Sequence, residues 1–574
     1  MYLRKCRRKV GGECKDYWQL VESYRTQRGP RQRVVAHLGD LDESGRIGVK
    51  EVASGNGDRV HQAGLFEDSK PRWADIDTSG VKVERTRFFG GPWLGLEVLD
   101  KLELVEFLES VMPRGREEIA WSMMSLVLVL SRLCDASSEL YIAEHLYERS
   151  ALGDLLGVPV GKVNDDRLYR ALDALLPHKS ALEKHLKERL GKLFEIEYDL
   201  LLYDVTSTYF EGLAESNEQA KRGYSRDHRG DCKQVCIALV VSKCGMPLAY
   251  EVFDGNRNDS TTVEEIVESI QSKYGSAERI WVMDRGMVSQ ENVEYLKENS
   301  QRYILGAPKA TLRRFEGELL SGGWQSIRDG LEVKLCPCPD GDETFILCRS
   351  SDRREKEKAM HDRFEKRIEA GLEKISAGSR KRHQKAVAVA ERIGRLLGAN
   401  SRAAGLFKVD VKEVDGRAEV VWSKVDAWRE WSNLSEGCYL LRSNITDWSA
   451  EELWRAYIQL TQAEAAFRIT KTDLSIRPIW HQRKKRVQAH ILVCFLAYVI
   501  WKALGQLCQR AGLGDEPRKV FDEISQIQMV DVVLPTKSGV HIRRRCVAQP
   551  TKHQAILLQR LGLTLPAQLE MHQM

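Results

Sequence analysis

The chain has 574 residues, of which 43% are hydrophobic and 30% charged, and its net charge is +5. This composition supplies apolar material for about four domains and excludes a largely disordered chain. The 13 scattered cysteines are too few for a disulfide scaffold and favour a reducing compartment, so we expect a cytoplasmic protein.

Two apolar runs approach the length of a membrane span. Ile119–Leu133 is interrupted by polar residues, and Ile491–Leu504 contains Lys502. Both fall short of the ~20 apolar residues that a span requires, so we expect two buried helices and no membrane partner.

The N-terminal third is predicted to contain two modules. Residues 1–50 carry 12 Lys and Arg against 6 Asp and Glu, and Arg31–Gly45 predicts a strand followed by a turn. We interpret residues 1–90 as a basic β-rich module. Its basic side chains either form an ordinary solvated surface or contact DNA. Residues 91–195 are predicted to be helical, with Asn164 as an N-cap, and form either a plain bundle or a DNA-binding domain.

Strands predominate from residue 196. Short apolar runs near residues 200–203, 235–241 and 247–253 predict three successive strands, and the runs at 279–284 and 302–307 each follow a predicted helix. This order predicts an α/β fold with a mixed sheet over 196–309. Residues 310–444 do not continue this pattern of strands and helices, and we interpret them as an insertion domain. Within it we expect a helical hairpin over Lys356–Leu397 that turns near Ser376–Ser379.

The remaining chain is expected to return to the core. Residues 445–510 contain a predicted helix over Leu453–Asp473, and residues 511–574 a hairpin and a short helix.

Three carboxylates carry the predicted chemistry. Asp204 and Asp284 each end an apolar strand, where an unpartnered acid would be costly unless it is hydrogen-bonded or bound to a cation. Glu464 shares one face of the predicted helix with Tyr457 and Lys471, seven residues away on either side. Carboxylates without Cys or His partners favour Mg²⁺, and two such ions suit phosphodiester chemistry.

A basic segment follows the third acid directly. Positive side chains beside a carboxylate site are what a polyanionic substrate requires. The residues predicted to contact DNA are Arg477, Arg483, Lys484, Lys485 and Arg486 in this segment, together with Arg468, which lies on the same side of the predicted helix as Glu464.

These segments resemble bacterial insertion-sequence transposases of the DDE class, in the insertion-sequence-four superfamily with its YREK signature. YDVTSTYFEG around Asp204 and VMDRGMVSQENVEYL around Asp284 are similar to the first two acidic blocks. The third block reads Tyr457-x2-Leu460-x3-Glu464-x6-Lys471, with Leu460 where the family has Arg. That departure removes one expected DNA or network contact.

The resemblance implies an RNase H-like catalytic core interrupted by an insertion domain between the second and third acids. It implies that Asp204, Asp284 and Glu464 hold two Mg²⁺ ions, with Mn²⁺ as a substitute, and that Tyr457 and Lys471 contact the DNA backbone. The implied reaction is cleavage at the terminal inverted repeats of double-stranded DNA followed by strand transfer into target DNA. The implied assembly is a homodimer that pairs the two ends.

Two alternatives remain open. The chain could be a metal-dependent nuclease on the same fold without joining activity, or a catalytically silent DNA-binding protein derived from a transposase.

Weaker signals point elsewhere. Cys336-x-Cys338 and Cys232-x3-Cys236 lack a second ligand pair, so zinc is not expected. We expect His490 to be a core or capping residue. Four tryptophans are candidates either for stacking on a flipped base or, as we favour, for core packing: Trp324, Trp422, Trp428 and Trp431.

Overall fold

The computed structural model describes residues 2–10, 13–26, 29–39, 74–337, 342–381, 384–414 and 417–569. The chain divides into two compact units, each described by itself. Unit 1 comprises Met1–Val10, Cys14–Trp281 and Gln459–Met574, and unit 2 comprises Gly11–Glu13 and Val282–Ile458.

Unit 1 begins with a three-stranded sheet in the order β1-β2-β3. Its strands are β1 (Tyr2–Val10), β2 (Glu13–Thr26) and β3 (Gly29–Gly39), and β2 runs antiparallel to β3. The strand predicted at Arg31 is therefore present, whereas the turn predicted up to Gly45 lies outside the described residues.

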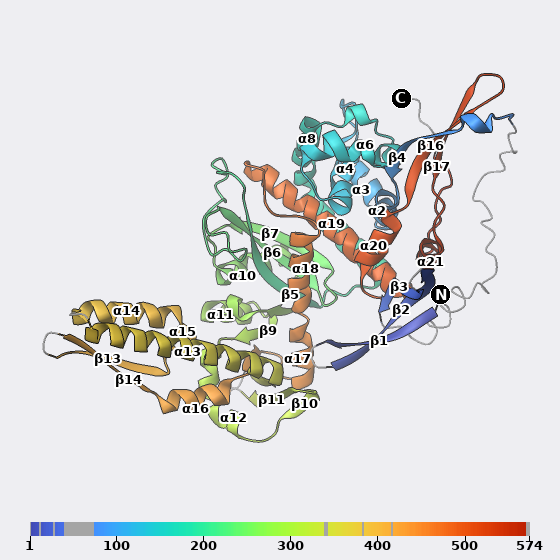
Figure 1. The fold of residues 1–574 in the computed structure, drawn as a ribbon. Coiled ribbons are helices and arrows are strands. Elements are labelled where there is room, and N and C mark those ends of the chain that lie inside the picture. The colour runs from blue at the N-terminus through green and yellow to red at the C-terminus, as the bar shows by residue number, and fades with distance from the viewer. Residues whose placement is uncertain are drawn as a thin grey trace. The chain divides into compact units, whose positions relative to one another are not determined.

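A second three-stranded sheet of unit 1 joins distant parts of the sequence (Figure 1). The C-terminal hairpin of β16 (Gln528–Pro535) and β17 (His541–Val547) pairs through β16 with β4 (Lys82–Phe88). A short 3₁₀ helix, η1 (Thr78–Gly80), precedes β4.

The predicted helical region is present in unit 1. Asn164 caps α8 as expected, because its side chain accepts a hydrogen bond from the backbone N–H of Arg167 at 2.8 Å. The helical elements of the region are α2 (Gly90–Lys101), α3 (Leu104–Val111), α4 (Trp121–Cys134), α5 (Glu139–Tyr141), the π-helical η2 (Ile142–Leu146), α6 (Tyr147–Arg149), α7 (Leu152–Leu156), η3 (Val160–Lys162), α8 (Asp165–Leu175), η4 (Leu176–His178) and α9 (Lys179–Phe194).

The longest helix of unit 1, α19 (Lys484–Arg510), forms the centre of the helical core. It packs against α2, α4, α8 and α20 (Pro517–Ser525) (Figure 1). Among the described residues it alone is long and apolar enough to cross a membrane, but 78% of its most apolar window is buried inside the protein. Both apolar runs of the sequence are thus buried helices, as predicted.

A third group of strands in unit 1, which includes Asp204, contains β5 (Leu200–Tyr209), β6 (Gln234–Ser242) and β7 (Pro247–Asp254). Neighbouring strands are antiparallel, and their apolar side chains are almost entirely buried. The chain continues through η5 (Asp259–Thr262) and α10 (Val263–Tyr274) to β8 (Ile280–Met283), within which the unit boundary falls. Two more helices complete unit 1: α18 (Thr461–Thr472) and α21 (Lys552–Leu561).

Unit 2 contains an antiparallel sheet in the order β10-β11-β12-β15-β9. Of these five strands, β9 comes first in the sequence, and it pairs directly with β15 from the far end of the predicted insertion, so both segments share one sheet. The strands are β9 (Arg302–Ala307), β10 (Gln325–Arg328), β11 (Leu331–Pro337), β12 (Thr344–Ser350) and β15 (Cys438–Ser443). Its short helices are η6 (Arg285–Met287), α11 (Gln290–Glu298), η7 (Lys309–Phe315), α12 (Glu316–Leu320), α16 (Asp426–Ser435) and α17 (Ala450–Ile458).

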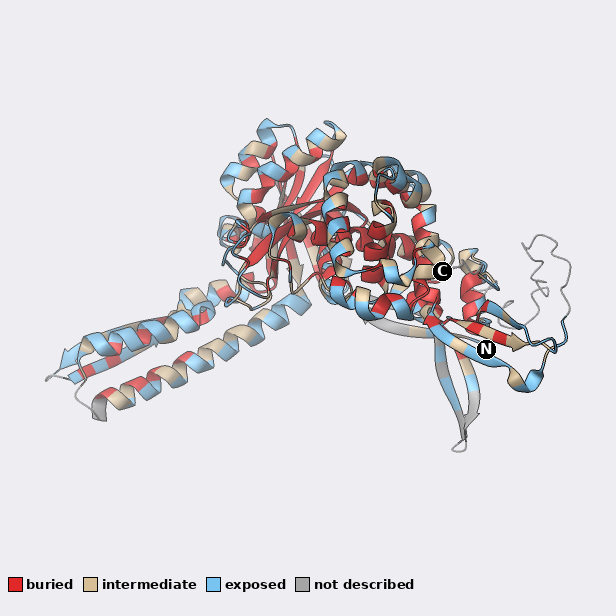
Figure 2. Ribbon diagram, turned by 90° about the horizontal axis from the view of Figure 1, so that it is seen from above, coloured by how far each residue is buried: buried red, intermediate tan, exposed pale blue. Residues whose placement is uncertain are grey.

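A separate small core of unit 2 lies between two long helices and a hairpin. Ile368 and Leu372 of α13 (Ser351–Lys381) pack with Val389 of α14 (Ala386–Ala399), whereas the outer helix faces are exposed (Figure 2). The predicted turn near Ser376–Ser379 is wrong, because α13 continues to Lys381. The other elements of this core are α15 (Ser401–Ala404), β13 (Phe407–Val414) and β14 (Arg417–Lys424).

Candidate active site

Asp204 lies in the middle of β5, directly after the buried run Leu200–Tyr203, so the prediction that it ends the strand is wrong: the strand continues to Tyr209. It is half-buried and opposite Leu239 of β6, and its Oδ1 accepts a hydrogen bond from the backbone N–H of Val205 at 2.8 Å. The strand therefore fixes the backbone of this acid while its side chain stays partly accessible.

Glu464 is exposed in the first turn of α18. This helix packs against β5 and β6, and its buried side chains include Ala463, Ala466 and Phe467. A carboxylate in the first turn of a helix is stabilised by the helix dipole. Unit 1 thus carries two of the three predicted acids, one on a central strand and one on the helix that covers that strand.

The prediction of a single helix over Leu453–Asp473 is wrong. The chain forms α17 up to Ile458 and α18 from Thr461, with a turn between them. The seven-residue spacing therefore still places Glu464 and Lys471 on one face of α18, but it does not extend to Tyr457.

Asp284 and Tyr457 meet within unit 2. Asp284 is exposed at the N-cap of η6, and the Tyr457 hydroxyl donates a long hydrogen bond of 3.4 Å to its Oδ1. Burial raises the pKa of Tyr457, and the charge of Asp284 adds to this effect, so the phenol keeps its proton. Asp284, the second of the three acids, therefore has its own supporting hydroxyl group.

Gly306 of β9 leaves the space that this tyrosine occupies. A Cβ at this position would lie 2.6 Å from the Tyr457 hydroxyl oxygen and 3.0 Å from the backbone nitrogen of Arg285. The absence of a side chain at Gly306 is what lets the tyrosine reach Asp284.

Lys471 is engaged differently from the prediction. Its side chain is only 10% exposed, and its Nζ lies 2.9 Å from Oδ1 of Asp227, which also contacts the guanidinium of Arg477. Two predicted DNA-binding cations therefore share one buried carboxylate.

Sequence reasoning missed the loop that supplies this carboxylate, residues 210–233 between β5 and β6. Its Arg226 pairs with Asp259, and the backbone N–H of Arg226 donates to Ser207 Oγ of β5 at 3.2 Å. Burial opposes the charge of Arg226, but Asp259 and then Asp204 raise its pKa. The length of the loop and its charged segment SRDHRGD were the available signal.

The basic segment after α18 is fixed to the end of β5. The backbone of Ile479 bonds to Tyr209 at 2.9 Å and to Glu211 at 3.0 Å, and next to it Trp480 is 65% exposed. Lys484 pairs with Glu218 and Arg486 with Asp173. Three predicted DNA contacts are exposed side chains on unit 1: Arg468, Arg483 and Lys485.

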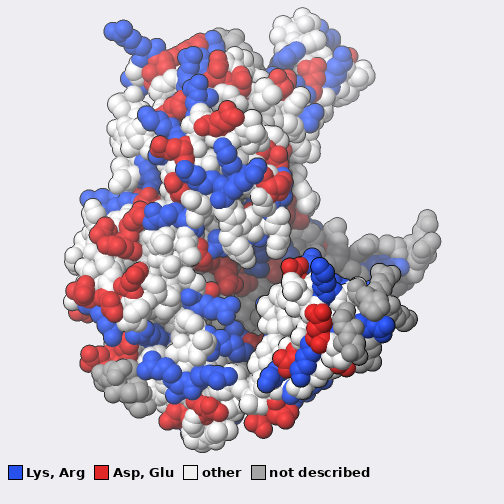
Figure 3. Space-filling model, turned by 90° about the vertical axis from the view of Figure 1, so that its left-hand side faces the viewer, with Lys and Arg blue, Asp and Glu red and all other residues white. Residues whose placement is uncertain are grey.

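Charges of both signs are interspersed on the face that Figure 3 presents. This agrees with the small net charge of +5. Electrostatic attraction of DNA would therefore come from local groups such as the 477–486 segment rather than from the net charge.

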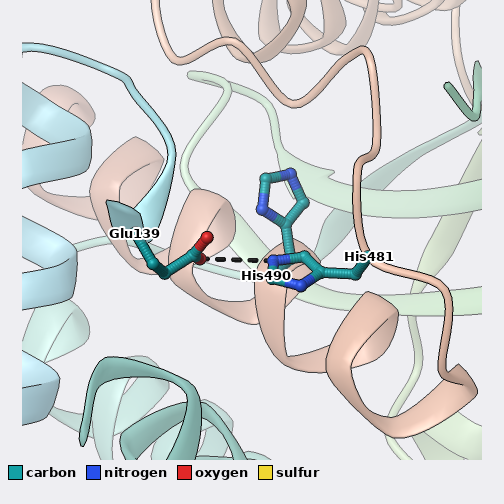
Figure 4. Close-up of side chains that lie close together, drawn as sticks. All are labelled: Glu139, His481 and His490. Carbon is teal, nitrogen blue, oxygen red and sulfur yellow. Dashed lines mark hydrogen bonds and ion pairs between the residues drawn. The ribbon is translucent and has the colours of Figure 1, made fainter. Parts of the chain in front are cut away.

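Glu139, His481 and His490 form a buried group in unit 1 whose ligand atoms lie within 4.8 Å of one another (Figure 4). His481 Nε2 lies 3.2 Å from Glu139 Oε1, and His490 contacts the Ile476 carbonyl through Nε2 and Arg132 through Nδ1. Both nitrogens of His490 are thus engaged, and a guanidinium lies beside the ring. We interpret the group as a hydrogen-bonded core network, in agreement with the expectation for His490.

The remaining candidates pack as structural residues. Trp422 and Trp428 lie against the small core of α13 and α14, and Trp324 and Trp431 against the core beneath η7 and α12. Cys236 is buried, and Cys338 lies outside the described residues.

Comparison with known proteins adds independent findings. A family model described as a transposase DDE domain matches residues 196–500, a model of the IS1634 family transposase N-terminal domain matches 3–63, and a domain of unknown function matches 94–184. No curated protein matches the chain. A solved piggyBac transposase synaptic complex with hairpin DNA is 10% identical, covering 79% of this chain and 82% of that chain with a TM-score of 0.35. Since the DDE model spans more than half of the sequence, the chain belongs to the DDE transposases, and its N-terminal match identifies it as one of a bacterial insertion sequence.

Proposed function

We propose that this transposase cleaves DNA at the terminal inverted repeats of its element and joins the freed 3′ ends to target DNA, with Asp204, Asp284 and Glu464 as its catalytic carboxylates. Members of the family act on DNA and use divalent metal ions. The observation that carries the assignment is the packing of α18, with Glu464, on β5, with Asp204.

The chemistry of the three side chains fits a hard divalent cation. All three offer carboxylate oxygens, Asp284 and Glu464 are exposed, and Asp204 is half-buried. Oxygen ligands of this kind favour Mg²⁺, with Mn²⁺ as a substitute. Asp204, Asp284 and Glu464 would hold such ions, which would supply Lewis-acid chemistry for the attacking and leaving oxygens of a phosphodiester.

The protein's own contribution is orientation. The Tyr457 hydroxyl holds one oxygen of Asp284, and the main-chain ladder of β5 with β6 holds Asp204 in place. Exposed Arg468, Arg483 and Lys485 are proposed to neutralise backbone phosphates, with Arg477, Lys484 and Arg486 nearby.

We further propose that the antiparallel β5-β6-β7 sheet begins an RNase H-like core, with 310–444 as its insertion. The six predicted segments (1–90, 91–195, 196–309, 310–444, 445–510 and 511–574) stay proposals, as do a homodimeric paired-end complex and a cytoplasmic location beside the nucleoid.

The test uses purified protein and a plasmid carrying the two ends of the element, with Mg²⁺ or with EDTA. Asp284→Ala should abolish both end cleavage and joined products, whereas Asp447→Ala, at an acid whose side chain is 73% exposed in the same unit, should retain both. Cleavage without joining would favour the nuclease alternative. End-specific binding without cleavage in Mg²⁺ and Mn²⁺ would favour the silent DNA-binding protein, with Leu460 as the suspect departure.

A further inference from the structure

Asp227 is a buried carboxylate outside the three acidic blocks. Its side chain is 5% exposed, and its Oδ1 contacts both Lys471 Nζ, at 2.9 Å, and Arg477. Within the described part of the chain, its second oxygen, Oδ2, is buried and has no hydrogen-bond partner. Burial of a carboxylate oxygen without a hydrogen-bond partner costs stability, so the position of Asp227 calls for an explanation.

The lysine partner depends on this carboxylate. Burial lowers the pKa of Lys471, the charges of Arg477 and Arg226 add to that effect, and Asp227 opposes it. A buried ammonium without a counter-ion would be strongly destabilising. Asp227 is therefore the group that keeps a charged lysine in this buried position.

The pair connects the elements that carry two catalytic acids. Lys471 lies seven residues after Glu464 on α18, about 10 Å along the same face. Asp227 directly follows Arg226, whose backbone N–H is anchored to Ser207, three residues after Asp204 on β5. One ion pair thus ties the helix of Glu464 to a loop fixed on the strand of Asp204.

We propose that Asp227 is a positioning residue for transposition: through Lys471 it holds α18, and with it Glu464, in register with Asp204. This inference rests on the proposed catalytic role of the two acids. It assigns Lys471 to the internal support of the site rather than to a DNA phosphate.

The experiment measures three quantities on the full-length protein: the rate of end cleavage, the affinity for Mn²⁺ by calorimetric titration without DNA, and the affinity for end DNA in Ca²⁺. Asp227→Asn should slow cleavage about 100-fold, because small misplacements of catalytic groups have effects of that size. It should weaken Mn²⁺ binding about 10-fold, as loss of support to metal ligands does. Affinity for DNA should stay within about twofold, less than one lost charge-assisted contact would cause.

The matched control is Asp231→Asn in the same loop. Asp231 is 66% exposed and pairs with Arg229 at 3.0 Å, so its loss should leave all three quantities unchanged. If Asp227→Asn folds poorly, the double variant Asp227→Asn/Lys471→Met removes the unpaired lysine. It should recover the melting temperature but neither the cleavage rate nor Mn²⁺ affinity.

Two results would overturn the inference. Full recovery of cleavage in the double variant would show that Asp227 only neutralises Lys471. A fall in DNA affinity as large as the fall in rate would show that the cluster binds DNA. A wild-type protein that neither cleaves DNA nor binds Mn²⁺ would instead refute the proposed function, and the inference with it.

Discussion

Lys471 Nζ and Asp227 Oδ1 lie 2.9 Å apart although 244 residues separate them in the sequence. The contact is buried on both sides, with 10% and 5% of the side chains exposed. By contrast, Arg483 and Lys485 are exposed at the start of α19. The basic residues around the third acid therefore divide into an internal group and a surface group, and these should differ in their effect on DNA binding.

The salt dependence of DNA binding separates the two groups. Each phosphate contact that is lost reduces the slope of log Kd against log salt by about 1. Arg483→Ala/Lys485→Ala should reduce the slope by about 2, whereas Lys471→Ala should leave it unchanged while slowing cleavage. Lys358→Ala on α13 serves as the control for an exposed lysine elsewhere. A reduced slope for Lys471→Ala would instead show that Lys471 contacts a DNA phosphate.

Much of the fold was predictable because buried strands leave continuous apolar runs in a sequence. The runs at Leu200–Tyr203, Val235–Val241 and Pro247–Phe253 all lie in strands of one sheet. The N-cap at Asn164 was equally visible, because capping is a local interaction between residues three apart. Such patterns can be recognised from residues that are close together in the sequence.

The rest depended on contacts that periodicity does not record. The turn before Thr461 is marked only by the capping-box spacing of Thr461 and Glu464, and the neighbouring Gln459, Leu460 and Ala463 are good helix formers that favour an unbroken helix. Asp227 could not be matched to Lys471 without the fold that brings the 210–233 loop onto α18. The role of Gly306 likewise became visible only once Tyr457 was placed above it.

Tyr457→Phe tests the hydroxyl that holds Asp284. Loss of the 3.4 Å hydrogen bond should slow end cleavage about 10-fold, equivalent to about 1.4 kcal/mol of activation free energy. Tyr439→Phe is the matched control, because its hydroxyl accepts from Trp454 Nε1 at 2.8 Å in the same unit. Each variant should lose about 1 kcal/mol of unfolding free energy. Equal rates of end cleavage for the two variants would show that the Tyr457 hydroxyl does not support the active site.

Gly306→Ala should displace the same tyrosine. Its Cβ would lie 2.6 Å from the hydroxyl oxygen, so we expect a loss of about 1–3 kcal/mol of unfolding free energy from overpacking. Gly306→Ala/Tyr457→Phe should be more stable than the sum of the single effects, because the clashing oxygen is gone. Urea denaturation of the four proteins checks this, and strict additivity would contradict the steric argument.

His490 should make the protein sensitive to mild acid. Burial, followed by the charge of Arg132, lowers its pKa to about 3 from the usual 6.5. Neutral His490 makes its full contribution to the unfolding free energy above pH 6.5. This contribution is lost as the pH falls toward 3, because His490 then takes up a proton in the unfolded chain but not in the folded chain. The unfolding free energy should fall by about 2–3 kcal/mol between pH 6 and pH 4 from this group.

His490→Gln should flatten that dependence, since an amide can keep both hydrogen bonds without titrating. His145→Gln, at a histidine whose side chain is 51% exposed, should follow the wild type. Chemical denaturation at several pH values gives the comparison. An unchanged slope in His490→Gln would mean that another group controls acid unfolding.

The sheet that joins β4 to the C-terminal hairpin is held by a buried ring of four charges. Arg87 contacts Asp154 at 2.5 Å and Asp531 at 2.7 Å, and Arg545 contacts the same two acids, with every side chain at most 9% exposed. Asp531→Asn would leave two buried guanidinium groups with one carboxylate, so we expect a loss of about 3–5 kcal/mol. Asp522→Asn, which removes an exposed partner of Arg518, should cost less than about 1 kcal/mol.

Urea denaturation measures both losses, and limited proteolysis should find the hairpin of β16 and β17 newly accessible only in Asp531→Asn. Similar stabilities for the two variants would show that the ring adds no more than a surface ion pair.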